Sequence, residues 1–542
     1  MNFIERILDV LDASPHKPLV TEVDGTTLLP TVGPELARLV REARAALRGR
    51  GVRPGDRVAL IGANSTLWVA ADLAILAEGG VTVPIYPHQA ADAQRIILED
   101  SEPRLIVCED ERTAQAGGGA PAATVHLRDL YGHGEQITDR AAPRDVDDVV
   151  SIIYTSGISG EPKGVRQTLG NLDYALPVVT DAIEAIVADV EGDHRIFHYL
   201  PFCFAGSRLM LWLSLCRGHS IYLATHVDAL FDEMATARPH YLLAVPAFLE
   251  RLKARLERDL AERPRGLQLL WRRGMSAWRN RAQGKLTFFD KATLPLAQRL
   301  VFDGVRRRLG PALTCLISSS APLGADTQRW FEMIGVPVYQ AYGLTETTGI
   351  VSLDKAGRIE PGRVGHPVHG CEVRVDPDTS ELLVRGPNVF AGYWRKPDDT
   401  AAAFSDGGWF HTGDRVERDD SGSLRIIGRA KNLLVAASGY NIAPEPLERK
   451  LVETIAGVQH AVVVGHGRPY LTAIVSGDAR REDVDRGVKR INEALPHYSR
   501  VKKFYITDEP FTPDNGMLTH NRKLRRDAIE AIYDKAIEAM YA

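Results

Sequence analysis

The sequence lacks the features that mark several specialised protein classes. Its 542 residues contain five scattered cysteines, and no two of them form a C-x-x-C pair. So few cysteines rule out a disulfide scaffold and indicate a reducing compartment. The 66 basic and 70 acidic residues give a net charge of −4. A chain this close to neutrality has no overall electrostatic attraction to nucleic acid, so we expect no nucleic-acid partner.

Long apolar runs are also missing. The segment Met1–Leu11 carries Glu5 and Asp9 within its apolar positions, so it does not have the uninterrupted core of a secretory signal. The run Leu209–Cys216 is far shorter than the roughly 18 apolar residues that a membrane span needs. We therefore expect a cytoplasmic protein. Its oligomeric state stays open at this point.

The overall composition is typical of a large globular protein. Hydrophobic residues make up 44% and charged residues 25% of the chain. Short apolar runs alternate with segments of helical periodicity, such as Glu35–Leu47 and Val69–Glu78. Such runs are typical of parallel strands that are buried on both faces, and the sequence predicts an α/β fold of doubly wound sheets. The expected strands are 57–61, 105–108, 149–154, 196–200, 220–223, 241–245 and 313–317.

The residue composition and the expected pattern of strands and helices change twice towards the C-terminus. From about residue 365 the chain is rich in Val, Gly and Pro, and the strands 372–375 and 381–384 flank a turn at Asp376–Thr379. After about residue 428 a small mobile α+β domain is expected, with strands 461–464 and 471–475 and helices 481–494 and 523–540. We predict a large domain at 1–428 with a β-rich subdomain at about 365–428, a hinge at 429–434 and a small domain at 435–542.

One segment has an unusual charge. Residues 263–289 carry seven arginines and lysines and no acidic residue, with Trp271 and Trp278 among them. The simpler interpretation is the solvated face of a helix. The alternative is a patch that contacts a membrane surface or an anionic ligand, which would make the protein peripheral to a membrane.

The strongest chemical signal is the segment Tyr154–Val165, YTSGISGEPKGV, which directly follows an apolar strand. Glycines let backbone N–H groups converge on an anion, while hydroxyls and a lysine add donors and positive charge. The glycine spacing differs from that of a P-loop. The sequence also contains neither an H-E-x-x-H zinc motif nor a G-x-S-x-G nucleophile elbow. We predict a phosphate-binding loop that uses Thr155, Ser156, Gly157, Ser159, Gly160 and Lys163.

This loop resembles the signature of the adenylate-forming (AMP-binding) superfamily, which includes acyl-CoA synthetases, luciferases and nonribosomal adenylation domains. The segment Gln340–Gly349, QAYGLTETTG, is similar to the second signature of that family. The resemblance implies that Thr345 contacts phosphate and that Glu346 coordinates Mg²⁺. Hard oxygen ligands suit Mg²⁺ that is bound mainly through nucleotide phosphates.

Further segments match the family in the expected order. SSSAPL at 318–323 resembles the adenine-binding segment, which implies contacts from Ser320, Ala321 and Pro322, with Tyr342 and Gly343 beside them. WFHTGD at 409–414 and GRAKNLLVAASGYNIAP at 428–444 resemble the ribose-binding and hinge segments. The roles implied there are ribose binding by Asp414 and Arg429, a hinge at Asn432, and a CoA channel at Gly439 and Tyr440. MLTHNRKLRR at 517–526 resembles the motif whose lysine, here Lys523, contacts the reacting carboxylate.

The resemblance implies an ATP-dependent ligase. Its reactants would include ATP and CoA, and its cofactor would be Mg²⁺. The order of the basic segment, RLVFDGVRRR at 299–308 and SSSAPL is most similar to long-chain fatty acyl-CoA synthetases. The segment 200–208, LPFCFAGSR, often carries a histidine at the acyl site. Here Phe204 stands there, and Phe202 is a second candidate for an acyl-site residue. We therefore expect a medium- to long-chain fatty acid as the substrate.

Two alternatives stay open. The adenylate could be passed to a carrier-protein thiol instead of CoA, and every adenylation residue would be the same. The chain could also be a non-catalytic nucleotide-binding homologue, because Ile158 replaces a hydroxyl residue that is common in the phosphate loop. The presence of Glu346, Asp414, Arg429 and Lys523 together argues against that second alternative.

Overall fold

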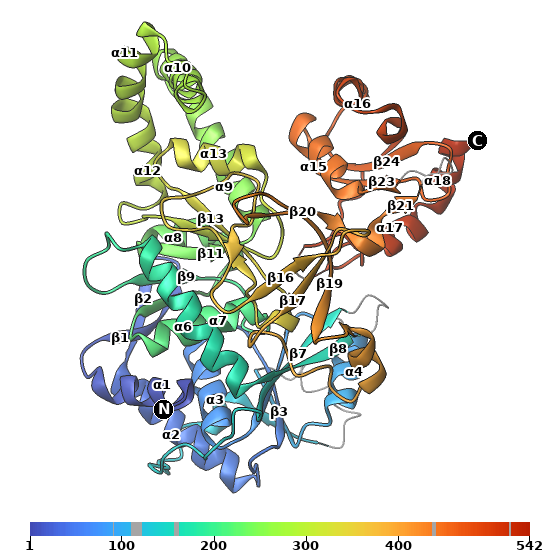
Figure 1. Cartoon of the computed structure of the whole chain (residues 1–542). Helices are drawn as coiled ribbons and strands as arrows, with labels where there is room; N and C mark the ends of the chain where they lie inside the picture. Colours follow the sequence, from blue (N-terminus) through green and yellow to red (C-terminus); the bar gives the residue numbers. More distant parts are fainter. Residues whose placement is uncertain (90, 110–121, 157–161, 436–440, 520–521) are drawn as a thin grey trace. The chain divides into compact units, whose positions relative to one another are not determined.

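Two compact units make up the chain in the computed structural model (Figure 1). The structure describes residues 1–89, 91–109, 122–156, 162–435, 441–519 and 522–542. The first unit comprises Met1–Val373 and Val384–Phe410, and the second comprises Arg374–Leu383 and His411–Ala542. The boundary therefore runs through the β-rich segment near 365–428. The predicted division at residue 428 and the hinge at 429–434 stay predictions.

A nine-stranded sheet forms much of the first unit, in the order β15-β14-β13-β12-β11-β9-β10-β1-β2. The neighbours from β13 through to β1 run parallel, and the outer pairs are antiparallel. The strands are β1 (Pro18–Asp24), β2 (Thr27–Val32), β9 (Arg195–His198), β10 (Ser220–Ala224), β11 (Tyr241–Ala244), β12 (Leu316–Ser318), β13 (Val338–Tyr342), β14 (Ser352–Leu353) and β15 (His366–Pro367).

A second sheet of six strands has the order β6-β5-β3-β4-β7-β8. It is parallel except for the antiparallel pair β7–β8. The strands are β3 (Arg57–Ile61), β4 (Val81–Ile85), β5 (Leu105–Cys108), β6 (Ala123–His126), β7 (Val149–Ser156) and β8 (Pro162–Thr168). The predicted fold class, doubly wound α/β sheets with a smaller C-terminal part, is confirmed.

Helices connect the strands of both sheets. They are α1 (Phe3–Ala13), α2 (Gly33–Gly49), α3 (Thr66–Ala77), α4 (Ala91–Ser101), η1 (Leu127–Leu130), α6 (Leu169–Ile186), α7 (Ala205–Cys216), η2 (Val227–Ala229), α8 (Leu230–Ala237), α9 (Pro246–Ala261) and α13 (Ala325–Met333). Helix α3 is apolar all round and buried along its length, as expected for a helix enclosed by other layers. No helix in the described ranges has the length and apolar character that a membrane crossing needs.

A buried ion pair joins these layers. Arg208 of α7 and Asp72 of α3 are both fully buried and lie 2.5 Å apart. Arg208 also donates to the hydroxyl of Ser151 on β7, and Trp212 donates to Asp72. Burial raises the pKa of Asp72, and the charge of Arg208 opposes that rise. The network fixes β7, the strand that leads into the predicted phosphate loop.

A helical hairpin extends away from the sheets of the first unit (Figure 1). It consists of α10 (Arg265–Ala282) and α11 (Phe288–Ala297), and it continues through the π-helical turn η3 (Gln298–Phe302) into α12 (Asp303–Leu309). The basic segment 263–289 forms α10 and the connection to α11.

The β-rich segment forms a five-stranded sheet. Its neighbouring strands have the spatial order β16-β17-β19-β18, and β20 also pairs with β19. Its elements are β16 (Glu372–Val375), β17 (Glu381–Arg385), α14 (Pro397–Ala402), β18 (Phe404–Ser405), β19 (Trp409–Arg418) and β20 (Leu424–Arg429), after the short turn η4 (Thr345–Thr347). The second unit continues with η5 (Ala430–Asn432), β21 (Leu434–Val435), β22 (Asn441–Ile442), α15 (Pro444–Thr454), β23 (Val458–Val464), β24 (Leu471–Gly477), α16 (Arg481–Glu493), η6 (His497–Ser499), β25 (Val501–Thr507), α17 (Arg526–Ile532) and α18 (Asp534–Tyr541).

Several elements differ in their bounds from the sequence-based prediction, and two of these differences have a clear structural cause. The strand expected at 313–317 begins three residues later, at Leu316, because Thr314 instead bonds through N–H and hydroxyl to the carbonyl of His240. The helix expected at 523–540 is wrong as a single element. It is divided into α17 and α18 at Tyr533, whose ring is buried and whose hydroxyl pairs with Thr507 of β25. Lys523 precedes both helices.

Candidate active site

The predicted phosphate loop lies between two paired strands of the six-stranded sheet. Strands β7 and β8 are antiparallel, with Thr155 opposite Lys163. Three of the predicted phosphate contacts, Gly157, Ser159 and Gly160, lie outside the described residues, and so does Ile158. The ends of the loop are therefore fixed by ladder pairing, so Thr155 and Lys163 are neighbours at its base.

A later segment of the chain packs against β8. Trp394 donates its backbone N–H to the carbonyl of Gly164 at 2.7 Å, and Tyr393 forms a bridge with Val165. The Cβ of any larger residue at position 164 would lie 2.7 Å from the side chain of Ile152. The close approach of these three backbone segments thus requires glycine at 164, and it brings Tyr393 beside Lys163.

Tyr393 lies between Lys163 and Glu346. The ammonium of Lys163 lies over the ring at 5.3 Å from its centre and pairs with Asp399 of α14 at 2.5 Å. The hydroxyl of Tyr393 donates to Oε1 of Glu346 at 3.1 Å. Burial and then the charge of Glu346 raise the pKa of Tyr393, so its hydroxyl keeps the proton that it donates. A cation from one signature segment and a carboxylate from the other therefore share one aromatic residue.

The backbone around Glu346 is closely packed. A Cβ at Gly343 would lie 2.3 Å from the carbonyl oxygen of Gly349, so this turn also requires glycine. The carbonyl of Glu346 accepts from Phe390 N at 2.9 Å, and the carbonyl of Thr345 accepts from the side chain of Gln167 at 3.4 Å. The turn η4 thereby presents Thr345 and Glu346 on a fixed backbone.

A magnesium ion fits this arrangement only if most of its ligands come from elsewhere. The described residues contain no group of three His, Cys, Asp or Glu side chains that could hold a metal. Glu346 offers one half-buried carboxylate. One carboxylate together with nucleotide phosphates is a common binding mode for Mg²⁺. The residues present therefore fit a nucleotide-bound ion.

The adenine-segment candidates lie in the connections that follow parallel strands. Ser320, Ala321 and Pro322 follow β12, and Tyr342 and Gly343 end or follow β13, its parallel neighbour. Ser320 has a φ of +75°, a conformation that non-glycine residues adopt at a cost and that is concentrated at functional sites. Connections beyond the carboxyl ends of parallel strands are the usual ligand sites of such sheets.

The two acyl-site candidates lie in different environments. Phe202 is 1% exposed and packs between the rings of His198, at 4.9 Å, and Trp68, at 5.1 Å. Phe204 is half-buried and stacks on Tyr86 at 6.4 Å. A ring that is enclosed on both faces has little surface left for a ligand, so Phe204 is the better candidate for a wall of an acyl site.

The ribose-site candidates pair with each other in the second unit. Asp414 on β19 lies opposite Arg429 on β20, and Arg429 Nε lies 2.8 Å from Asp414 Oδ1. Asp414 is buried, whereas Arg429 is about one-third exposed. Glu381 accepts from the backbone N–H of Gly413 at 2.8 Å and from His411 at 3.0 Å. Glu381 therefore holds the turn that leads into Asp414.

The hinge candidate is bonded to the helix that follows it. The side-chain amide of Asn432 donates to Oε1 of Glu445 at 2.7 Å. The backbone N–H of Arg429 donates to the same oxygen at 3.4 Å. Glu445 lies in the first turn of α15. The CoA-channel candidates Gly439 and Tyr440 lie outside the described residues.

Lys523 is exposed in a tight turn before α17. Its backbone N–H donates to the hydroxyl of Thr519 at 3.0 Å, and its carbonyl accepts from Thr519 N at 2.7 Å. Arg526, at the start of α17, pairs with the buried Glu448 at 2.7 Å and donates to the carbonyl of Val463. The turn that contains the exposed Lys523 is thus anchored to the core of the second unit.

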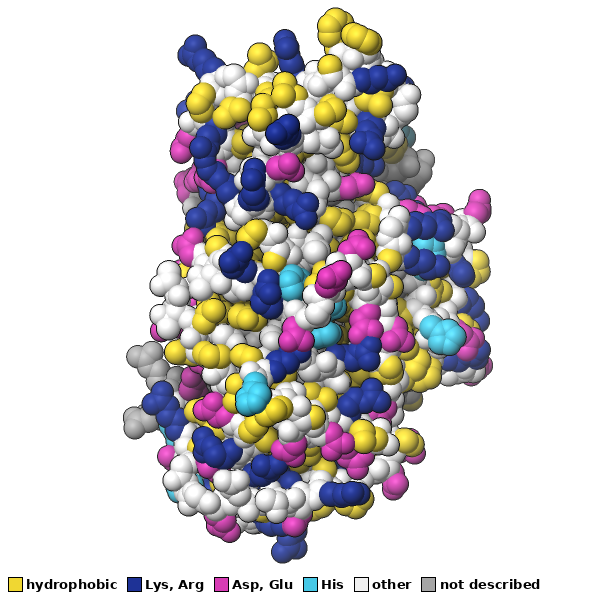
Figure 2. Space-filling model, turned by 90° about the vertical axis from the view of Figure 1, so that its left-hand side faces the viewer, with side chains coloured by type: hydrophobic (Ala, Val, Ile, Leu, Met, Phe, Trp, Pro, Cys, Tyr) yellow, Lys and Arg dark blue, Asp and Glu magenta, His cyan; other side chains and the backbone are white. Residues whose placement is uncertain are grey.

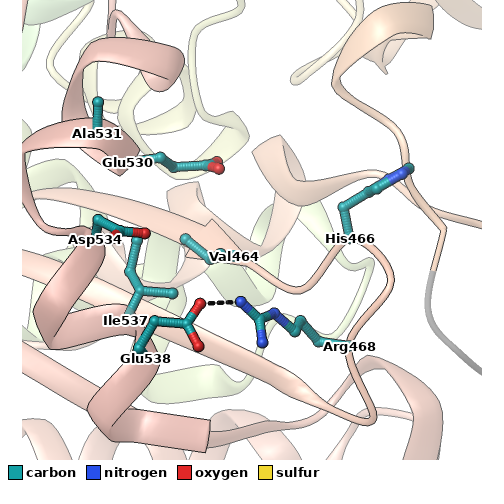
Figure 3. A pocket seen from close by; sticks show the side chains of 8 residues that line it. All are labelled: Val464, His466, Arg468, Glu530, Ala531, Asp534, Ile537 and Glu538. Carbon is teal, nitrogen blue, oxygen red and sulfur yellow. Dashed lines mark hydrogen bonds and ion pairs between the residues drawn. The ribbon is translucent and has the colours of Figure 1, made fainter.

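A separate hollow in the second unit contains none of these residues. It has a volume of about 490 Å³, and Figure 3 shows its lining side chains on β23, the connection after it, α17 and α18. Arg468 and Glu538 form an ion pair across it. Its other lining residues are Val464, His466, Glu530, Ala531, Asp534 and Ile537.

Comparison with known proteins places the chain in a family. Residues 33–394 match the model of the AMP-binding enzyme family, and residues 431–542 match its C-terminal domain. The chain belongs to the AMP-binding enzyme family. This confirms the resemblance that the two signature segments indicated.

Individual relatives of this AMP-binding enzyme are similar over almost their whole length. A Mycobacterium bovis protein named long-chain-fatty-acid–CoA ligase FadD15 is 31% identical, over 94% of this chain and 91% of the relative. An Arabidopsis thaliana protein named long-chain-fatty-acid–[acyl-carrier-protein] ligase AEE15, chloroplastic, is 25% identical, over 94% and 82%. An ATP-bound RpMatB–BxBclM chimera is similar in structure, with a TM-score of 0.76 and 25% identity over 99% of this chain and all of that chain.

Four polar neighbours of the candidate site in this AMP-binding enzyme have no signal in the sequence. Tyr393 and Asp399 lie more than 200 residues after Lys163, and Glu381 and Glu445 contact residues that lie at least 13 positions away along the chain. None of them belongs to a recognisable motif. Only the folded chain shows that they touch the predicted residues.

Proposed function

We propose that the chain is an AMP-forming acid–thiol ligase for a medium- to long-chain fatty acid. In this proposal it converts the acid to an acyl-adenylate and then to acyl-CoA. The sequence relatives named as fatty acid–CoA ligases support the substrate class. The observation that carries the proposal is that Lys163 and Glu346, which belong to two different signature segments, both contact Tyr393.

The first half-reaction joins two anions. A carboxylate oxygen attacks the α-phosphorus of ATP, a P–O bond to pyrophosphate breaks, and acyl-AMP forms. The repulsion between the anions must be offset by fixed positive charge and by hydrogen-bond donors. We assign Lys163, Thr155, Ser156, Gly157, Ser159, Gly160 and Thr345 to the phosphates. When Mg²⁺ is bound to the nucleotide, it would neutralise phosphate charge, with Glu346 as its protein ligand.

The remaining nucleotide contacts come from other segments. We assign Ser320, Ala321, Pro322, Tyr342 and Gly343 to adenine. Asp414 would accept hydrogen bonds from both ribose hydroxyls, because a carboxylate has lone pairs for two donors. Arg429 already bonds Asp414 at 2.8 Å, so it is oriented to reach the ribose. Lys523 would donate to the reacting carboxylate, because its ammonium supplies positive charge where the two anions meet.

The second half-reaction transfers the acyl group. The CoA thiol attacks the acyl carbon, a thioester forms and AMP leaves. We assign Asn432 to the hinge about which the small domain changes orientation between the two steps. Gly439 and Tyr440 would line the thiol channel. In the acyl site, Phe204 and Tyr86 offer stacked aromatic faces that suit an apolar chain.

A carrier-protein thiol is the second candidate acceptor. The relative named as an acyl-carrier-protein ligase is the observation that favours it. It requires the same adenylation residues, so only the acceptor distinguishes the two functions. A protein that only binds nucleotide has no need for Lys523, which we assign to the reacting carboxylate, so this lysine argues against a non-catalytic role.

Pyrophosphate release tests the proposal. The protein is incubated with Mg-ATP and a series of fatty acids and aryl acids, each with and without CoA. The proposal predicts turnover that requires CoA and peaks at one fatty acid chain length. Adenylate formation without CoA turnover would indicate a carrier-protein acceptor. Bound ATP without any acid-dependent release would contradict the enzyme assignment.

A further inference from the structure

The α10–α11 hairpin and the turn η3 that follows it carry nearly half of the exposed large apolar side chains of the described chain. Among the described residues, 13 large hydrophobic side chains are exposed, and six of them lie between residues 263 and 302. Phe288 and Phe289 are 84% and 80% exposed at the start of α11. The other four are Leu269, Leu286, Leu296 and Leu300. A concentration of exposed apolar side chains is typical of a surface that binds a partner or a membrane.

The same hairpin has a charge of one sign. Residues 263–302 contain nine arginines and lysines and a single acidic residue, Asp290. Within the part of the chain that the structure describes, none of the nine forms an ion pair with a carboxylate. The carboxylate of Asp290 accepts hydrogen bonds from Thr287 N at 3.0 Å and Asn280 Nδ2 at 2.9 Å, so it is used to cap α11. Figure 2 shows dark blue and yellow side chains mixed at the top of the molecule, the end where Figure 1 places this hairpin.

The base of the hairpin is packed firmly. Trp271 of α10 contacts the rings of Phe302, at 5.2 Å, and Trp330, at 6.0 Å. Gly274 allows α10 to approach α11 so closely that a Cβ there would lie 2.5 Å from that of Ala297. The exposed phenylalanines are therefore carried at the end of a folded, anchored element.

We propose that the α10–α11 hairpin is a membrane-docking element that binds bilayers containing anionic lipids. Phe288 and Phe289 insert at the boundary between headgroups and acyl chains, where aromatic rings are favoured. The surrounding cations contact the lipid phosphates. A strongly positive hairpin with two exposed phenylalanines at its end is complementary to an anionic bilayer. Nucleic acid would satisfy the charges but would leave the two phenylalanine rings without an apolar environment.

Vesicle flotation of the full chain tests the proposal in the absence of substrates, so its outcome is independent of the proposed reaction. The probes are vesicles of phosphatidylcholine alone and of phosphatidylcholine with phosphatidylglycerol. We expect flotation with the anionic vesicles at low salt, release at roughly 0.5 M salt because charges are screened, and little flotation with phosphatidylcholine alone.

Two variants separate the apolar and the charged contributions. F288S/F289S should lower the partition coefficient on anionic vesicles by at least about tenfold, because both rings lose their burial. R279Q/R281Q/K285Q should lower it by roughly fivefold per charge removed. L28S/L29S is the matched control, since it replaces an adjacent exposed apolar pair on β2, and it should bind like the wild type.

Three results would overturn the proposal. These are absence of flotation of the wild type with anionic vesicles at low salt, equal flotation with both lipids, and unchanged flotation of F288S/F289S. The first result would leave the hairpin as a site for a protein partner. Circular dichroism and thermal unfolding of each variant show that it is folded, and the high exposure of both phenylalanines means that their replacement leaves the core intact.

Discussion

The hydroxyl of Tyr393 donates a hydrogen bond to Oε1 of Glu346 at 3.1 Å, while the face of the same ring lies against the ammonium of Lys163. One aromatic side chain thus contacts both charged groups, Lys163, which we assign to the phosphates, and Glu346, which we assign to Mg²⁺. Its two interactions use different parts of the residue, the hydroxyl and the π-face. Substitution can therefore remove them one at a time.

Replacing Tyr393 with Phe removes the hydroxyl and keeps the ring over Lys163. We expect the KM for Mg-ATP to rise by roughly threefold to tenfold, the effect of losing a net hydrogen-bond contribution of about 1 kcal/mol. The measurement is acid-dependent pyrophosphate release at varied Mg-ATP. Tyr131→Phe is the control, because it removes a hydrogen bond to the carbonyl of Leu67 without touching Glu346. An unchanged KM in Tyr393→Phe would show that Glu346 is held by other contacts.

Replacing Asp399 with Asn removes the anion that pairs with Lys163. In the wild type, Lys163 must break its ion pair with Asp399 before it can bind phosphate. Since the variant lacks this ion pair, we expect its KM for ATP to fall. Asp399 is partly exposed, so the change should be no more than about fivefold. Asp398→Asn, which changes the adjacent acid of α14, should have little effect. A raised KM in Asp399→Asn would mean that the ion pair positions Lys163 for binding.

Replacing Lys523 with Ala should abolish adenylation and leave the transfer from supplied acyl-adenylate to CoA largely intact. The reason is that the ammonium is assigned to the carboxylate in the first half-reaction only. Pyrophosphate release and thioester formation measure the two steps separately. Lys535→Ala, an exposed lysine on α18, is the control. Near-normal adenylation by Lys523→Ala would refute the assignment.

Replacing Gly274 with Ala should lower the free energy of unfolding by about 1–3 kcal/mol. The added methyl group would lie 2.5 Å from the Cβ of Ala297 within a packed helix pair. Gly266→Ala in the same helix meets no atom within 4 Å. It should be neutral or stabilising by up to about 1 kcal/mol, because glycine is a poor helix former. Denaturant unfolding of both variants checks the difference, and equal stabilities would contradict the close approach.

Asp354 should make the stability of the protein depend on pH. Burial raises the pKa of Asp354 from 3.8 to about 7. Between these values the unfolded chain is ionised while the folded chain keeps the proton. The free energy of unfolding therefore falls as the pH rises from about 4 to 7. Asp354→Asn removes this titration, and its single amide oxygen can still accept from Gln340 N and Gln328.

The comparison of the two proteins by thermal unfolding at several pH values checks this prediction. Asp354→Asn should gain stability relative to the wild type as the pH rises through this window, by an amount on the order of 3 kcal/mol at neutral pH. Below pH 4 the difference should vanish. A difference that is constant over the whole range would exclude the titration of Asp354 as its cause.

Local patterns allowed much of the fold and many candidate residues to be predicted from the sequence. Strand β3 is a short apolar run, and it lies where the sequence predicts it. Lys163 and Glu346 are in compact signature segments. In contrast, Tyr393, Asp399 and Glu445 are single residues whose contacts depend on the tertiary fold, and nothing near them in the sequence marks them. The sequence predicts a helix over 523–540, whereas the hydrogen bonds of Thr519 close a turn at Lys523 instead.

The bond between Asn432 and Glu445 has a kinetic consequence. Glu445 accepts from the residue that we assign to the hinge and also from the backbone of Arg429. Rotation about the Cα–C bond of Asn432 changes the distance between the amide and this carboxylate, so the bond must break before the small domain can turn about that bond. The strength of one hydrogen bond, about 1 kcal/mol net, then contributes to the activation barrier that separates the two half-reactions. The rate at which the enzyme alternates between them is in that case set partly by a residue that touches no substrate.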